Sequence, residues 1–321
     1  MKTVAGMLCL AGILSLGMGT TVFAEDGDSH YPVTITTYNY ENEPIEMTFE
    51  KAPEKVFAYA NSNIEELLAL GLGDKIVAAC GLDGDVREDL KDEFDKIQYM
   101  DTKPSKEEVV AMEPDFIAAW YSSFDDDWLS DVSFWQERDV NTYMSLNSSA
   151  KGPASEFPRT IEDEYEDILN LGKIFDCEDK AEEIVDQMKG EIDKVKEHVE
   201  GTDPLSVAVL EDEGDSFRVY GTETLGGNIP ETLGAELKLG AENSENVGAE
   251  DLIAADPDVL FMINYDGFMT ADEAIADITD NPAYASLSAV KNNKVFSVNL
   301  NEVYCSGVRT YDGIMTFAKA L

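Results

Sequence analysis

Residues 107–117 read EEVVAMEPDFI, and residues 250–260 read EDLIAADPDVL. The two stretches lie 143 residues apart, and the Glu, Ala, Pro and Asp positions are identical between them. Each predicts a helix with acidic residues at its start, a proline that ends it, an aspartate in the turn and a buried strand. This repeat favours two similar lobes, each with its own parallel sheet. Two ordinary helix–turn–strand units would give the same pattern.

The sequence on either side of the repeat alternates between strand and helix patterns. A helix is predicted at 64–72, where Gly71 and Gly73 can end it in the left-handed conformation. Short loops between such elements indicate parallel strands in an α/β fold. The predicted strands are 33–40, 45–49, 55–60, 75–79, 206–210, 259–263 and 294–298.

A long segment between the two repeat copies has a different pattern. Apolar residues recur at helical spacing from about residue 160 to 199, with a break near Gly172 and residues 175–177. This predicts two consecutive helices that join the lobes. The predicted organisation is therefore α/β with two lobes, each a mainly parallel sheet flanked by helices, joined by a long connecting helix. Its predicted divisions are an amino-terminal lobe at 25–158, connecting helices at 159–200 and a carboxy-terminal lobe at 201–321. A cleft between two lobes is a favoured place for a ligand.

The first residues have the pattern of an export signal. Lys2 precedes an apolar run at 4–18, and Val22, Phe23 and Ala24 provide the small residues that precede cleavage. The run is too short and too rich in glycine for a membrane span. We therefore predict a signal peptide at 1–24 and a protein in the periplasm or on the outer face of the cytoplasmic membrane. Cys9 lies inside the run, so there is no clear lipid-anchor cysteine.

Charge and composition limit the partners. The 321 residues include 66 Asp and Glu but 23 Lys and Arg, a formal net charge of −43, while 44% of residues are hydrophobic. That apolar content is too high for a disordered chain. No basic stripe is visible, so the sequence argues against nucleic acid and anionic lipid as partners.

Few residues suit a metal or a catalytic site. The chain has two histidines, His30 and His198, so a three-histidine metal site is impossible and Ser–His catalysis is poorly supported. Cys80, Cys177 and Cys305 are widely spaced and are expected to be isolated core thiols. We predict no metal site, no catalytic residue and no enzyme. A carboxylate-dependent exported hydrolase remains an alternative, because residue counts alone do not exclude it.

Several motifs in order resemble the iron-siderophore, haem and cobalamin type of ABC importer substrate-binding proteins, the periplasmic-binding-protein family with a single rigid connecting helix. The resemblance covers nearly the whole mature chain. It rests on FEKAPEKV at 49–56, NIEELLALGLGDKIV at 63–77, both acidic Pro–Asp turns, ILNLGKIF at 168–175 and GVRT at 307–310.

The resemblance implies a function and partners. Such proteins are two-lobed, hold a ferric siderophore, haem or cobalamin between the lobes, and deliver it to a membrane permease driven by a cytoplasmic ATPase. The expectation is a monomer with no intrinsic cofactor. By position, Glu65 and Glu231 correspond to permease-docking acids, with Glu223 as an alternative to Glu231. A ligand-sensing surface module with the same fold is a further alternative.

Candidate ligand contacts come from loops at the carboxyl ends of strands, where open α/β sheets bind ligands. Aromatic rings can lie against a macrocycle or chelate, and arginine can bond its oxygens. Trp120 and Phe217 fit a core position equally well. Because the candidate loops supply chiefly Arg218 and Arg309, a neutral or weakly charged chelate is expected, such as a hydroxamate, or a corrinoid or haem. The predicted contacts are Tyr59, Tyr121, Trp128, Arg218, Tyr220, Tyr265 and Arg309.

Overall fold

The computed structural model describes residues 30–240, 246–265 and 267–321. The chain divides into residues 1–30 and one compact unit of residues 31–321, and the fold described below is that of the second unit. The predicted signal peptide at 1–24 lies outside the described residues. Over the ranges that the structure describes, no helix has both the length and the apolar character needed to cross a membrane.

The amino-terminal lobe is built on a five-stranded parallel sheet with the order β5-β4-β3-β6-β7. Its central strands are apolar on both faces, as expected for parallel strands covered on two sides, and all four residues of β6 are buried. The elements are β3 (Val56–Tyr59), α1 (Asn61–Ala69), β4 (Ile76–Cys80), α2 (Lys91–Phe94), β5 (Tyr99–Met100), α3 (Lys106–Ala111), β6 (Phe116–Ala119), α4 (Val132–Gln136) and β7 (Asn141–Met144).

An antiparallel hairpin precedes this sheet. β1 (Val33–Tyr38) and β2 (Pro44–Phe49) pair along their whole length, and alternate residues such as Ile35, Met47 and Phe49 are buried. The sequence predicts strands at 33–40 and 45–49, and the structure confirms both and pairs them antiparallel.

The carboxy-terminal lobe has a second sheet with the order β10-β8-β11-β12, in which β9 pairs antiparallel with β8. The other pairings in this sheet are parallel. The elements are β8 (Ser206–Asp212), β9 (Phe217–Val219), α7 (Leu225–Thr232), β10 (Glu236–Leu237), α8 (Ala249–Ala255), β11 (Val259–Asn264), α9 (Ala271–Thr279), α10 (Ser288–Lys291), β12 (Val295–Asn299) and α11 (Thr310–Ala318).

The two copies of the repeat occupy equivalent places in the two sheets. The first forms α3 and β6, and the second forms α8 and β11. Glu113 and Asp256, the residues before the two prolines, both have positive φ, 52° and 41°. Asp115 accepts hydrogen bonds from the backbone N–H groups of Glu54 and Lys55, immediately before β3. Asp258 accepts hydrogen bonds from the backbone N–H and the hydroxyl of Ser206, the first residue of β8. In each lobe the aspartate therefore caps the neighbouring parallel strand, as two similar lobes require.

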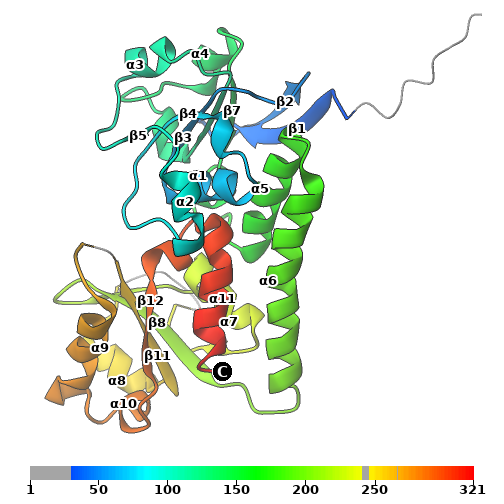
Figure 1. Cartoon of the computed structure of the whole chain (residues 1–321). Helices are drawn as coiled ribbons and strands as arrows, with labels where there is room; N and C mark the ends of the chain where they lie inside the picture. The colour runs from blue at the N-terminus through cyan, green and yellow to red at the C-terminus, as the bar shows by residue number, and fades with distance from the viewer. Residues whose placement is uncertain (1–29, 241–245, 266) are drawn as a thin grey trace, which may run out of the picture. The chain divides into compact units, whose positions relative to one another are not determined.

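Two consecutive helices connect the lobes. α5 (Ile161–Ile174) and α6 (Glu178–Val199) pack against each other, and α6 also packs against α11. Figure 1 shows α6, in green, beginning near the amino-terminal lobe and running along the carboxy-terminal one. The predicted fold class, an α/β protein with two parallel-sheet lobes joined by a long helix, is confirmed. The residue divisions between lobes stay a prediction.

Candidate functional site

A pocket lies where residues of the amino-terminal lobe and the pre-α5 segment meet the carboxy-terminal lobe. We call it the inter-lobe pocket. It has a volume of about 170 Å³. Polar, aromatic and cationic side chains line it, and no carboxylate is found among its described lining residues. The lining residues are Asn147, Ser149, Ala154, Arg159, Arg218, Tyr220, Thr224, Leu225, Val303, Tyr304 and Cys305.

Aromatic rings continue from this pocket into the amino-terminal lobe. The rings of Tyr304 and Trp120 meet edge to face at 6.0 Å between centroids, and those of Trp120 and Tyr59 at 6.4 Å. Tyr59 is the last residue of β3, and Trp120 directly follows β6, so both stand at carboxyl ends of parallel strands. The Trp120 Nε1–H donates to Ser62 Oγ at 2.9 Å, which fixes the indole. This row of rings places aromatic side chains beside the pocket, where one of them could pack against a chelate.

Two arginines supply the positive charge of the pocket. The Arg218 side chain is 47% exposed and lies 3.7 Å from the Glu211 carboxylate. Arg159 is held by the carbonyls of Phe157 and Gly152 and by Ser149 Oγ, at 2.7–2.9 Å. Partial burial lowers the pKa of Arg159, although a guanidinium remains charged in any folded protein.

The structure brings three of the seven predicted contacts to this region. Arg218 and Tyr220 line the inter-lobe pocket, and Tyr59 belongs to the row of rings. Tyr220 is 1% exposed, and its hydroxyl donates to Glu211 at 2.9 Å. Burial beside Glu211 raises its pKa, so its polar atom is committed to the protein.

None of the other four predicted contacts lines the pocket. Tyr121 stacks on Tyr40 of the hairpin segment, 4.8 Å between centroids, and donates its hydroxyl to the Tyr40 carbonyl. Trp128 is buried against Phe57 and Tyr59 and donates to the Pro104 carbonyl. Tyr265 packs on the exposed ring of Phe268.

Arg309 is the fourth of these predicted contacts. It forms an ion pair with a buried acid and does not line the pocket. Its Nε and Nη2 atoms each donate to the Glu65 carboxylate at 2.7 Å, and the Glu65 side chain is fully buried. The pair joins α1 to the turn before α11. A permease could reach Glu65 only if this pair opened, so its docking role stays a prediction. Glu231 lies exposed on α7.

No sequence pattern predicts the remaining lining residues. Arg159 lies in a segment without strand or helix periodicity, and its place depends on hydrogen bonds to residues 149–157. Trp120 and Tyr304 both follow strands, and loops after strands are where the sequence predicts ligand contacts.

Buried acids lie behind the pocket. Glu164 accepts hydrogen bonds from Asn147 and from the backbone of Ser306 and Gly307. Burial raises the pKa of Glu164 to about 7. Asp167 accepts from the Tyr143 hydroxyl at 2.8 Å, and burial raises its pKa well above the usual range. Glu66 is 2% exposed, and burial beside Asp167 and Glu164 raises its pKa in the same way.

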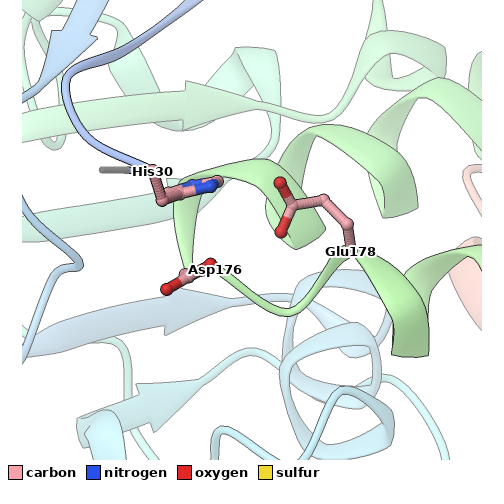
Figure 2. Close-up of side chains that lie close together, drawn as sticks. All are labelled: His30, Asp176 and Glu178. Atoms are coloured by element: carbon pink, nitrogen blue, oxygen red, sulfur yellow. The ribbon is translucent and has the colours of Figure 1, made fainter. Parts of the chain in front are cut away.

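A second acidic group lies at the turn between α5 and α6. Figure 2 shows the side chains of Asp176 and Glu178, which flank Cys177 in the sequence. Acidic groups at exposed turns are common without a bound metal. His30, labelled in the same figure, is the last residue of the segment 1–30, and no site is assigned to these residues.

Comparison with known proteins identifies the family. A model of the periplasmic binding proteins matches residues 56–299. The Bacillus subtilis ABC transporter substrate-binding lipoprotein YvrC, itself uncharacterised, is 24% identical over 333 aligned positions, which cover 100% of this chain and 98% of YvrC. The Fe(3+)-citrate-binding protein YfmC of the same organism is 25% identical over 62% of this chain and 58% of its own length.

A solved structure agrees with these matches. A periplasmic binding protein from Veillonella parvula superimposes with a TM-score of 0.84 at 33% identity, covering 90% of this chain and 91% of that one. Proteins of this family bind ligands and are not enzymes. The chain therefore belongs to the periplasmic binding protein family, the substrate-binding components of ABC transporters.

Proposed function

We propose that this protein captures an iron chelate, such as a ferric siderophore, in the inter-lobe pocket and delivers it to the permease of an ABC importer. The observation that carries the proposal is the pocket itself, where both lobes contribute polar and cationic groups beside a row of aromatic rings. Haem and cobalamin, which also have flat extended faces, are the other ligands proposed for the same site. Similarity to YfmC, which is named an Fe(3+)-citrate-binding protein, favours an iron chelate over haem and cobalamin.

The proposed partners are a permease in the cytoplasmic membrane and its ATPase. Glu231 is exposed on α7 and remains the docking acid that we propose for the carboxy-terminal lobe. The protein acts outside the cytoplasm, as its lipoprotein relative YvrC supports. A ligand sensor with the same fold would bind the same chelate without delivering it, so transport in cells separates the two functions.

Ligand binding tests the proposal directly. Trp120 lies beside the pocket, so a bound chelate should change tryptophan fluorescence. We expect saturable quenching by at least one of ferric citrate, ferric hydroxamates, ferric catecholates, haem or cobalamin. The variant Trp120→Phe should bind with a smaller signal, whereas Trp135→Phe, changed in the core, should keep the signal. Absence of binding across the whole panel would contradict the proposal.

A further inference from the structure

We infer that the ligand of the inter-lobe pocket is an anionic chelate and that Arg159 is the residue that selects for its negative charge. The inference rests on the proposed function and deepens it, because it assigns the charge class of the ligand. It also replaces the neutral chelate that the sequence predicts from Arg218 and Arg309. In the structure Arg159 takes the place of Arg309 in the pocket, and an anion is favoured because Arg159 has no charged partner and no described lining residue is acidic.

Arg159 is a guanidinium without a charged partner. Its neighbours in the sequence are rich in acids, yet no described carboxylate forms an ion pair with it. Its three hydrogen-bond acceptors are two carbonyls and a hydroxyl. Asp163, an acid close enough to act on Arg159 electrostatically, is bound instead to Lys151. A half-buried cation is costly to leave uncompensated. An anionic ligand would provide the missing charge.

Arg159 also keeps hydrogen-bond donors for a ligand. A guanidinium has five N–H groups. The three bonds that hold Arg159 come from Nη1 and Nη2, which leaves Nε–H and one Nη1–H without an acceptor among the described residues. Because Arg159 lines the pocket, a carboxylate or another oxygen anion could accept from them there.

The rest of the pocket favours the same sign of charge. Its described lining contains no acid, although 66 of the 321 residues are acidic. Arg218 lies in the same lining. Its guanidinium is 3.7 Å from the Glu211 carboxylate, so its positive charge is only partly compensated. Thr224 and Leu225, at the start of α7, add the positive end of a helix to the pocket. In a protein of net charge −43, the described lining of this pocket carries two arginines and no acid.

The test compares chelates of different charge. Fluorescence titrations would use ferric citrate as the anionic probe, a neutral ferric trishydroxamate and a cationic ferrioxamine. We expect the wild type to bind the anionic probe most tightly, with an affinity that falls as salt rises. Arg159→Gln should weaken binding of ferric citrate by about tenfold or more, with little effect on the neutral probe.

Two further variants keep the result interpretable. Arg159→Lys retains the charge and should lose less affinity than Arg159→Gln. Arg138→Gln, which removes an exposed arginine from the amino-terminal lobe, should leave all affinities unchanged. Circular dichroism and thermal unfolding establish that each variant is folded.

Failure of the inference and failure of the proposed function look different. Preferred binding of a neutral or cationic chelate, or full affinity of Arg159→Gln for ferric citrate, would overturn the inference and leave the iron-chelate function intact. Binding of iron-free citrate without any iron chelate would overturn the proposed cargo and support the charge selection. If no probe binds, both the inference and the proposed function are overturned.

Discussion

At the scale of single residues, the contact between Glu65 and Arg309 has the clearest energetic consequence. The side chains are 0% and 12% exposed, and the backbone N–H of Arg87 also donates to Glu65. We predict that Arg309→Gln lowers the free energy of unfolding by about 3–5 kcal/mol, because it leaves a buried carboxylate unpaired. Urea unfolding followed by fluorescence at pH 7 measures this loss.

The matched experiments separate the ion pair from general damage. The double variant Glu65→Gln, Arg309→Gln should recover part of the lost stability, because no buried charge is left alone. Lys180→Gln breaks the exposed pair with Glu183 on α6 and should cost much less. Equal losses from Arg309→Gln and Lys180→Gln would show that the buried pair has no special role.

At the scale of elements, the repeat makes a prediction about symmetry. Asp115 and Asp258 each hold the backbone at the start of a central parallel strand, β3 and β8. Replacing either by alanine should cost about 0.5–2 kcal/mol, the range for a lost side-chain cap, and the two losses should be similar. Chemical denaturation measures both. Asp126→Ala, at an exposed loop position, provides the control. A loss confined to one lobe would refute the equivalence.

The repeat also shows which parts of the structure can be predicted from the sequence alone. Helix, proline turn and strand are local patterns, so short stretches of sequence are enough to predict β6 and β11. The same is true of the carboxyl end of α1, where Gly71 has a φ of 81°. The functional residues depend on tertiary contacts. Arg309 was predicted as a ligand contact, but buried Glu65 holds it. Arg159 lies in a segment without a periodic pattern, and only the fold brings it into the lining of the same pocket as Arg218.

At the scale of the whole molecule, buried acids link the connecting helix to both lobes. Glu66 lies on α1, Glu164 and Asp167 lie on α5, and Glu164 accepts from the backbone of Ser306 and Gly307. Gly307 has φ of 54°, and a Cβ there would meet Glu66 at 2.9 Å. The acids are therefore enclosed where the two lobes and α5 meet, and their protonation contributes to the stability of the joined lobes.

The sign of the pH dependence follows from the raised pKa values. In the unfolded chain these carboxyl groups ionise near pH 4. In the folded protein they keep their protons to higher pH, to about 7 for Glu164. Between those values the folded state binds more protons, so the free energy of unfolding should fall as pH rises from 4 through 7. Repulsion within a chain of net charge −43 acts in the same direction, so the wild type alone does not separate the two causes.

A charge-matched pair of variants does separate them. Glu66→Gln removes the buried carboxyl group, and Glu182→Gln removes an exposed one from α6. Both change the formal charge equally, so general repulsion falls by the same amount. We predict that Glu66→Gln flattens the pH dependence and raises stability relative to Glu182→Gln at pH 8, with little difference between them at pH 4. Urea unfolding from pH 4 to 8 measures both curves. Parallel curves would mean that Glu66 is not the source, and the dependence would then belong to the general charge of the molecule.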